Sequence, residues 1–295
     1  MQSSSEVFPR FFSALNQPIE SRGKGDEMTK YGMVIDLTRC AGCQTCVVSC
    51  QLTNNQRPGI AWGTVEAVEM GSWPDSDRLY LPHACMHCDD APCVEVCPTG
   101  ASTKRDDGIV VVDYDVCIGC ASCDEACPYG ARRLSKEDVW FFDAETPAPY
   151  ETVDSHPVGV SEKCIFCYGR VDNNLQPMCV ASCPTKARVF GDLDDASSEI
   201  HAYISETGAV NMPGTAIYYV KGNHDFDVAS VIMSGEAPVV KSDPPEEKKG
   251  TEGFDPLVVG VGGAVVVAAA AGIGVAVKKS KDKAKVGVDD AKDGE

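Results

Sequence analysis

Hydrophobic and polar residues alternate over short stretches of this chain, and long irregular segments separate those stretches. Residues 31–37, 64–70, 109–113 and 216–220 have the alternation or the β-branched content that is typical of strands. The sequence therefore predicts short strands at these places, with most of the chain in the connections between them.

A further stretch is different in kind, because residues 257–277 are 21 consecutive Val, Ala, Gly, Leu and Ile residues without a charge. As a helix the stretch would be about 31 Å long at about 1.5 Å per residue, which matches the hydrocarbon core of a membrane. A buried helix of a soluble core is the alternative, but residues 236–256 before it are rich in Pro, Glu and Lys, a composition typical of linkers. The sequence predicts a linker over 236–256 and a transmembrane helix over 257–277.

The charges beside this helix predict its orientation. The tail, residues 278–295, begins with a dense run of lysines, whereas Lys248 and Lys249 lie farther from the helix on its other side. Because Lys and Arg favour the cytoplasmic side, we expect a single-pass protein of the cell membrane with a cytoplasmic tail and an extracytoplasmic body. Residues 1–28 are expected to form a flexible arm without an ordinary secretory signal, and Met28 is a second candidate start. Export would then depend on a partner that carries the signal.

The cysteine content changes the picture. The chain contains 16 cysteines, which fall into four sets of four that we call tetrads. The tetrads are Cys40, Cys43, Cys46 and Cys50; Cys85, Cys88, Cys93 and Cys97; Cys117, Cys120, Cys123 and Cys127; and Cys164, Cys167, Cys179 and Cys183. Disulfide frameworks do not repeat such short gaps, so these cysteines are predicted to be metal ligands.

The third tetrad identifies the metal centre most specifically. Residues 117–128 have the spacing of the bacterial ferredoxin run, in which three cysteines bind one [4Fe–4S] cluster and the fourth binds a second cluster. Structural zinc sites instead use two chelating pairs separated by a loop. The net charge of −18 argues against a nucleic-acid partner, since binding to a duplex requires clustered Lys and Arg.

The spacing between tetrads predicts how they pair. Nineteen residues separate the second tetrad from the third, against 34 between the first and second and 36 between the third and fourth. This favours tetrads two and three as one unit, residues 79–149, inserted into an outer unit of residues 29–78 and 150–235 that carries tetrads one and four. The predicted fold class is α+β, with two interleaved bacterial dicluster-ferredoxin-like units followed by one C-terminal transmembrane helix.

Residues 85–101, 117–131 and 163–167 resemble the four-cluster iron–sulfur subunits of the dimethyl sulfoxide reductase family of molybdoenzymes, and the resemblance covers roughly residues 30–220. It implies four [4Fe–4S] clusters, each held by three cysteines of one tetrad and one cysteine of its partner tetrad. By position, it assigns Cys40, Cys43, Cys46 and Cys183 to cluster a; Cys164, Cys167, Cys179 and Cys50 to cluster b; Cys85, Cys88, Cys93 and Cys127 to cluster c; and Cys117, Cys120, Cys123 and Cys97 to cluster d.

The resemblance also implies a partner, a large catalytic subunit that holds bis-molybdopterin guanine dinucleotide. We therefore expect an electron-transfer subunit, with no catalytic residue or substrate site of its own, in anaerobic respiration. It would pass electrons between this catalytic subunit and a membrane or quinone-linked partner, either quinol-oxidising or a cytochrome. A free-standing, membrane-tethered polyferredoxin that serves several redox partners is the alternative, and a structural zinc protein is a third possibility.

Some other residues have two interpretations. His83 and His87 flank Cys85, but the second tetrad is already complete, so we interpret them as packing or hydrogen-bonding residues rather than ligands. The cations nearest the cysteines either stabilise reduced clusters or are ordinary solvated charges; they are Arg39, Arg132, Arg133, Lys163 and Arg170. The tryptophans Trp62, Trp73 and Trp140 are interpreted as hydrophobic anchors.

Overall fold

The computed structural model describes residues 19, 29–141 and 157–235, all within a unit that extends from Met1 to Pro245. The four predicted strands are confirmed as β1 (Tyr31–Asp36), β2 (Thr64–Ser72), β5 (Val110–Val112) and β10 (Ile217–Val220). The predicted linker, transmembrane helix and tail lie outside the described residues, as does the predicted arm apart from Ile19. No helix among the residues described has both the length and the apolar character that membrane crossing requires.

The other elements are short, and the pattern of alternation did not predict them. They are α2 (Thr45–Thr53), β3 (Asp75–His83), α3 (Pro92–Glu95), β4 (Ser102–Lys104), α4 (Ser122–Glu125), β6 (Arg133–Leu134), β7 (Ser161–Glu162), α5 (Tyr168–Val171), α6 (Met178–Ala181), β8 (Arg188–Asp192), α7 (Glu199–Thr207), β9 (Val210–Asn211) and α8 (Val228–Ser234). The mixed helix and strand content agrees with the predicted α+β class. The predicted boundary between residues 78 and 79 falls inside β3.

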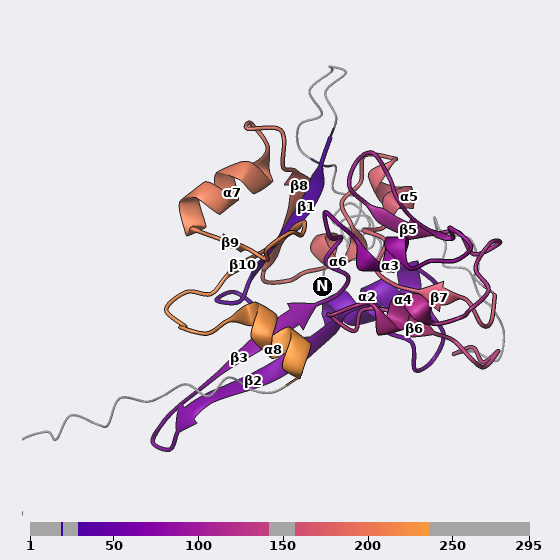
Figure 1. Cartoon of the computed structure of the whole chain (residues 1–295). Helices are drawn as coiled ribbons and strands as arrows, with labels where there is room; N and C mark the ends of the chain where they lie inside the picture. Colours follow the sequence, from indigo (N-terminus) through magenta and orange to yellow (C-terminus); the bar gives the residue numbers. More distant parts are fainter. Residues whose placement is uncertain (1–18, 20–28, 142–156, 236–295) are drawn as a thin grey trace, which may run out of the picture. The chain divides into compact units, whose positions relative to one another are not determined.

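The largest sheet is built around β1. Its strand order is β8-β1-β10-β9, with β1 antiparallel to β8 and parallel to β10. All six residues of β1 are buried, because the sheet is covered on both faces. Val34 packs with Ile200 of α7 on one face, whereas Met33 and its alternate neighbour Ile35 belong to the main core on the other. Figure 1 shows α7 beside β1 and β8.

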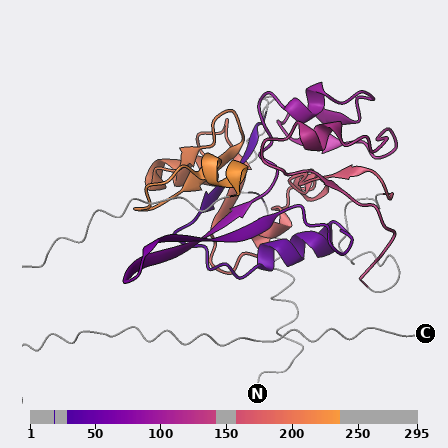
Figure 2. The ribbon, with the colours of Figure 1, turned by 60° about the horizontal axis from the view of Figure 1, so that its bottom comes forward.

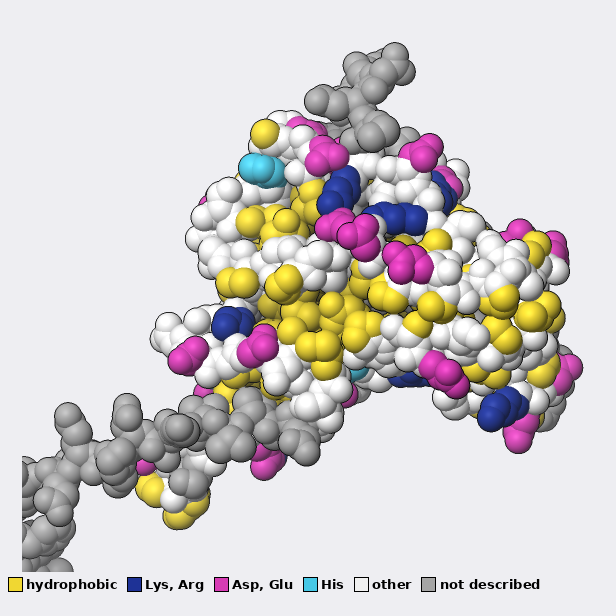
Figure 3. Space-filling view, in the orientation of Figure 1, with side chains coloured by type: hydrophobic (Ala, Val, Ile, Leu, Met, Phe, Trp, Pro, Cys, Tyr) yellow, Lys and Arg dark blue, Asp and Glu magenta, His cyan; other side chains and the backbone are white. Residues whose placement is uncertain are grey.

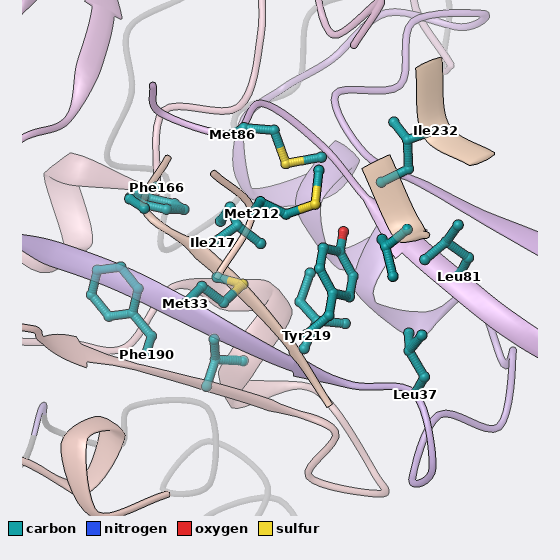
Figure 4. Packing of buried hydrophobic residues seen from close by; sticks show 14 of the residues in the cluster. Met33, Leu37, Leu81, Met86, Phe166, Phe190, Met212, Ile217, Tyr219 and Ile232 are labelled. Atoms are coloured by element: carbon teal, nitrogen blue, oxygen red, sulfur yellow. The ribbon is translucent and has the colours of Figure 1, made fainter. Parts of the chain in front are cut away.

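The main core joins the sheet to a hairpin of β2 and β3. The base of the hairpin contributes Leu79 and Leu81, which are 4% and 0% exposed, and Tyr219 of β10 donates a hydrogen bond from its hydroxyl to the Pro82 carbonyl (2.9 Å). Figure 4 shows Leu81 and Tyr219 in the same cluster as Ile232 of α8. These contacts fix the orientation of the segment that leads into the second tetrad.

Two of the tryptophans, Trp62 and Trp73, lie in different environments. Beyond its base the hairpin reaches away from the sheet as a two-stranded arm (Figure 1, Figure 2), and Trp73 at its tip is 89% exposed. The interpretation of Trp73 as a hydrophobic anchor is therefore wrong. Trp62, which is 2% exposed and packs with Ile60 and Ile165, confirms that interpretation at its own position.

The cysteine loops repeat one backbone conformation. Gly42 and Gly119 occupy the same position in tetrads one and three, each with a φ of +65°. In both loops a second left-handed residue follows two positions later, at Gln44 and Ala121, and it precedes a helix. A Cβ atom at Gly119 would clash with the carbonyl oxygen of Gly159, so only glycine fits there. These residues with positive φ turn the backbone of each cysteine loop back on itself.

Ile200→Ala tests the packing of α7 on the sheet. Ile200 is 0% exposed, and its truncation should lower the free energy of unfolding by about 2–5 kcal/mol, the usual cost of such a cavity. The measurement is the urea midpoint, followed by far-UV circular dichroism without oxygen. Val210→Ala in β9, a residue that is 56% exposed, is the control and should change stability by about 0.5 kcal/mol or less. Equal losses in the two variants would contradict the packing described.

Candidate metal centres

The cysteines gather in four groups, and each group contains cysteines from two tetrads. We call them groups a to d, after the clusters to which the resemblance assigns them. Group b shows this most clearly, because Cys50 of tetrad one lies beside Cys164, Cys167 and Cys179 of tetrad four. In group a, Cys40 lies near Cys46 and Cys183, while Cys43, between the first two in sequence, is exposed. Cys50 and Cys183 have thus exchanged partners between tetrads one and four.

Two short helices hold this exchange in place. Cys50 belongs to α2, Cys183 follows α6, and the two helices pack against each other. Ser49 and Ser182, the residues just before these cysteines, join their hydroxyl groups in a hydrogen bond of 2.7 Å. Each cysteine is thereby turned toward the loop of the other tetrad.

Tetrads two and three make the same exchange. One cavity is lined by the four cysteines of group c, which are Cys85, Cys88, Cys93 and Cys127. A second cavity is lined by the four cysteines of group d, which are Cys97, Cys117, Cys120 and Cys123. Here α3 packs against α4, as α2 packs against α6 in the outer pair. The groups contain the residues that the family resemblance assigns to clusters a to d, and the ligation of iron by them stays a prediction.

The groups follow one another in the order a, b, c, d. Cys46 of group a lies near Cys179 of group b, and Cys164 of group b lies near Cys85 of group c. Cys93 of group c and Cys123 of group d belong to one buried cluster. The exposed cysteines are Cys43 and Cys120, which lie in the first and last groups of the series. The series is thus buried in its middle and reaches the surface at both ends.

Backbone N–H groups donate to the sulfur of the last cysteine in three tetrads. Ser102 donates to Cys97 (3.4 Å), Ala131 to Cys127 (3.5 Å) and Ala187 to Cys183 (3.3 Å). Each of these cysteines precedes a proline, which turns the chain so that the following backbone comes back over the sulfur. Hydrogen bonds to cysteine sulfur are one of the means by which proteins set the potential of an iron–sulfur cluster.

Cys50 precedes no proline, and side chains supply its donors instead. Gln56 donates from Nε2 to the Cys50 sulfur (3.2 Å), and Asn54 donates from Nδ2 to the same sulfur (3.5 Å). Asn54 also reaches Cys167 Sγ at 3.8 Å. Both amides are almost fully buried, with 2% of Gln56 and 1% of Asn54 exposed. The sequence analysis did not find these two residues, since no motif marks an amide that reaches back to a cysteine.

Hydroxyl groups lie two residues after several cysteines, which is a second repeated feature. The sulfur-to-oxygen distances are 3.3 Å for Cys43 and Thr45, 3.8 Å for Cys97 and Thr99, 3.5 Å for Cys120 and Ser122, and 3.6 Å for Cys183 and Thr185. These cysteines belong to groups a and d, so the two outer groups have hydroxyl partners of the same kind.

Two thiols of the middle groups, at Cys88 and Cys164, have raised pKa values. Burial, helped by the neighbouring Cys85, Cys93 and Cys127, raises the pKa of the Cys88 thiol to about 12. Burial and neighbouring thiols also raise the pKa of Cys164 to about 12. Free thiolates are therefore costly at these two positions, whereas a bound metal replaces the protons and stabilises the thiolates. Four sulfurs around one cavity, with N–H donors directed at them, form a donor set that fits a [4Fe–4S] cluster.

Over residues 29–141 and 157–235, no set of three or more His, Cys, Asp or Glu side chains is arranged to hold a metal ion. His83 and His87 make contacts other than ligation. His87 Nδ1 accepts a hydrogen bond from the Val110 N–H (3.1 Å), and its ring stacks on Phe166 with centroids 3.8 Å apart. His83 Nε2 lies 2.8 Å from the Thr64 hydroxyl. Both residues therefore pack or form hydrogen bonds, as interpreted, and that neither is a ligand stays a prediction.

The cations divide between the two interpretations given above. Lys163, Arg132 and Arg170 are 1%, 2% and 1% exposed, so the interpretation as solvated charges is wrong for them. Arg39 is exposed and Arg133 is partly exposed, as solvated charges are. The sequence analysis missed a further buried cation, Arg188, which is 8% exposed. A signal for it exists, because Arg132 and Arg188 both follow a Cys-Pro-x-x-Ala stretch.

The chain is similar to known iron–sulfur proteins. The family described as the 4Fe-4S dicluster domain matches residues 76–143 and 136–193. A protein of Halobacterium salinarum named as an iron–sulfur subunit of dimethyl sulfoxide reductase is 42% identical over 216 residues, which are 66% of this chain and 80% of that protein.

Two further relatives carry other substrate names. The arsenate respiratory reductase iron–sulfur subunit of Shewanella is 40% identical, over 59% of this chain and 87% of that protein. A sulfite dehydrogenase subunit of Allochromatium vinosum is 39% identical, over 63% of this chain and 78% of that protein. The relatives thus match a similar share of this chain, whereas their names differ in substrate.

Pairs of cysteine substitutions test the exchange between tetrads. Cys50→Ser and Cys167→Ser should each remove the same cluster, and the double variant should lose no more than either alone, because both residues belong to group b. Cys50→Ser combined with Cys46→Ser should remove two clusters. The measurements are iron content, with a loss of about four iron atoms per cluster, and the spectrum of the reduced protein in electron paramagnetic resonance (EPR). If Cys50→Ser and Cys46→Ser removed the same signal, the grouping would be wrong.

Proposed function

We propose that this chain, which belongs to the iron–sulfur subunits of the dimethyl sulfoxide reductase family of molybdoenzymes, holds four [4Fe–4S] clusters in groups a to d. It passes electrons along them between a molybdopterin catalytic subunit and a membrane or quinone-linked partner in anaerobic respiration. The observation that carries this proposal is the unbroken series of cysteine groups, each beside the next.

The cofactor supplies the chemistry. When bound, a [4Fe–4S] cluster with a thiolate on every iron transfers one electron at a time and leaves no iron position open for a substrate. The chain's own residues hold the clusters, donate hydrogen bonds to their sulfurs and exclude water from groups b and c. We therefore assign no catalytic residue to this chain, and place the substrate site and the bis-molybdopterin guanine dinucleotide in the partner.

The two ends of the series are where we expect electrons to enter and leave. Cys43 of group a and Cys120 of group d are exposed, whereas Cys167 of group b and Cys85 of group c are buried. Ile118, between two ligands of group d, is 67% exposed, which is unusual for so large an apolar side chain. An electron carrier between two partners needs an accessible cluster at each end and insulation between them.

We also propose the division into two interleaved units. The outer unit, residues 29–78 and 150–235, gathers tetrads one and four, and the pairing of β1 with β8 and β10 supports it. The inner unit, residues 79–149, gathers tetrads two and three. The two exchanges of cysteines, one within each unit, are the contacts expected of dicluster ferredoxins.

The membrane assignment rests on the sequence. We propose that residues 257–277 cross the cell membrane once and that the tail 278–295 lies in the cytoplasm. The linker 236–256, as a flexible coil, spans about 25 Å and lets the cluster-bearing unit stand off the membrane. The cluster-bearing unit then lies outside the cytoplasm, exported together with its catalytic partner.

Metal analysis of the intact complex tests the subunit assignment. We expect the tagged chain, purified in mild detergent from native membranes without oxygen, to bring a large second chain with it. Molybdenum should be present at one atom per about sixteen or more iron atoms. Iron without molybdenum or a stable large partner would instead favour a free-standing polyferredoxin. Zinc in place of iron would exclude both.

Deletion of residues 257–277 tests the membrane tether. Expressed without its partners, the full chain should resist extraction by alkaline carbonate, whereas the deleted chain should be found in the soluble fraction with its iron retained. Deletion of the tail 278–295 alone is the matched control and should leave the protein in the membrane fraction. In intact cells carrying the whole complex, external protease should reach the cluster-bearing unit; complete protection would contradict the proposed orientation.

A further inference from the structure

Arg132 and Arg188 occupy equivalent positions in the two units. Each follows a Cys-Pro-x-x-Ala stretch that ends a tetrad, and in both stretches the alanine N–H donates to the cysteine sulfur, at 3.5 Å for Ala131 and 3.3 Å for Ala187. The backbone therefore returns over the cysteine in the same way, and both arginine side chains are buried. In the second tetrad Ser102 takes this position, so the arginine occurs once in each unit.

Arg188 lies between groups a and b. Its Nη2 donates to Cys46 Sγ of group a at 3.8 Å, and its guanidinium also interacts with Cys179 of group b. Burial opposes its charge, but these sulfurs more than compensate and raise the pKa of Arg188 above its usual value. Its other terminal nitrogen, Nη1, lies 3.3 Å from Met33 Sδ, a neutral neighbour.

Arg132 lies between groups c and d. It interacts with Cys93 of group c and with Cys123 of group d. Ser161 connects it to group d a second time, since the serine hydroxyl lies 3.4 Å from Arg132 Nη1 and 3.3 Å from Cys123 Sγ. The two arginines thus have the same relation to the two cluster pairs.

Lys163 lies between the two units. It interacts with Cys164 of group b and with Cys85 and Cys93 of group c. Its ammonium group donates to the carbonyls of Cys164 (2.8 Å) and Val110, which hold it at this junction. Each junction in the series, a to b, b to c and c to d, therefore contains one buried cation.

Carboxylates do not neutralise these cations. Among the described residues, none of the three forms an ion pair with an Asp or Glu side chain within 4.0 Å. Buried charges require compensation, and all three cations interact with cysteine sulfurs, which become thiolates when they bind a metal. The positive charges are thus placed to interact with whatever charge the groups carry.

We propose that Arg188, Lys163 and Arg132 each raise the reduction potentials of the two clusters that they separate, so that an electron is stabilised on either side of every junction. This inference rests on the proposed four-cluster function. Reduction adds one electron, and hence one negative charge, to a cluster, and a cation a few ångströms away in a poorly solvated interior stabilises the reduced form. Because each cation interacts with cysteines of two groups, it acts on both clusters of a junction.

Arg132→Met and Arg188→Met test the proposal in the purified complex. We expect the two clusters beside the lost charge to become harder to reduce by about tenfold, which is about 59 mV for a one-electron couple, while the other two keep their potentials. The measurement is EPR of samples poised at a series of potentials. Arg133→Met is the matched control, because this neighbouring side chain donates to the Arg132 carbonyl (2.7 Å) rather than to a cysteine group. The shifts should persist at high salt, since these charges are buried.

A second pair of variants tests the proposal in case a methionine variant loses a cluster. Arg132→Lys keeps the charge and should keep the potentials near those of the native protein, whereas Arg132→Gln should lower them. Equal potentials in these two variants, or a uniform shift of all four clusters, would overturn the inference while leaving the four-cluster function intact. A native protein with fewer than four clusters by iron content and EPR would instead overturn the proposed function.

Discussion

The exchange of the last cysteine between paired tetrads is the constraint on which the rest of the structure depends. Cys50 and Cys183 change places through the packing of α2 on α6, and the hydrogen bond between Ser49 and Ser182 fixes the crossing. The pair α3 and α4 repeats the arrangement for tetrads two and three. These crossings join four loops that are distant in sequence, and together with the main core they hold the cysteine-rich part of the chain in place.

Local pattern was sufficient to predict some of the structure. The four predicted strands are present because alternation and β-branching are properties of a few adjacent residues, and the gaps within tetrads have the same local character. The hairpin strand β3 was not predicted, since its outer half, from Asp75 to Arg78, is polar and exposed and carries no alternation. Trp73 was wrongly interpreted because residue type alone does not say whether a tryptophan lies at a hairpin tip.

The candidate sites were also predictable only where a local sequence pattern marks them. The cysteines could be named in full, but their neighbours Gln56 and Asn54 could not, because a buried amide that serves a sulfur from six or four residues away leaves no periodic signal. Arg188 is an intermediate case. Its position repeats that of Arg132, so comparing the two halves of the chain would have found it.

The charges are distributed unevenly between surface and interior. The net charge is −18, yet the buried charged side chains are mostly cations: Arg57, Arg132, Lys163, Arg170 and Arg188, against Asp36 and Glu162. On the face drawn in Figure 3, acidic side chains are spread over the surface around an apolar centre. The negative charge is thus concentrated on the exterior, while the interior retains positive charge beside its sulfurs.

The topology of the large sheet has a consequence for synthesis. Strand β1 ends at Asp36, but its partners β8 and β10 begin only at Arg188 and Ile217. At about 5–20 residues per second, a ribosome needs on the order of ten seconds or more to reach them. During that time the first tetrad is outside the ribosome with free thiols, and β1 has no partner strand. The second and third tetrads, in contrast, emerge close together. The large sheet is therefore begun before tetrads two and three emerge and finished after them.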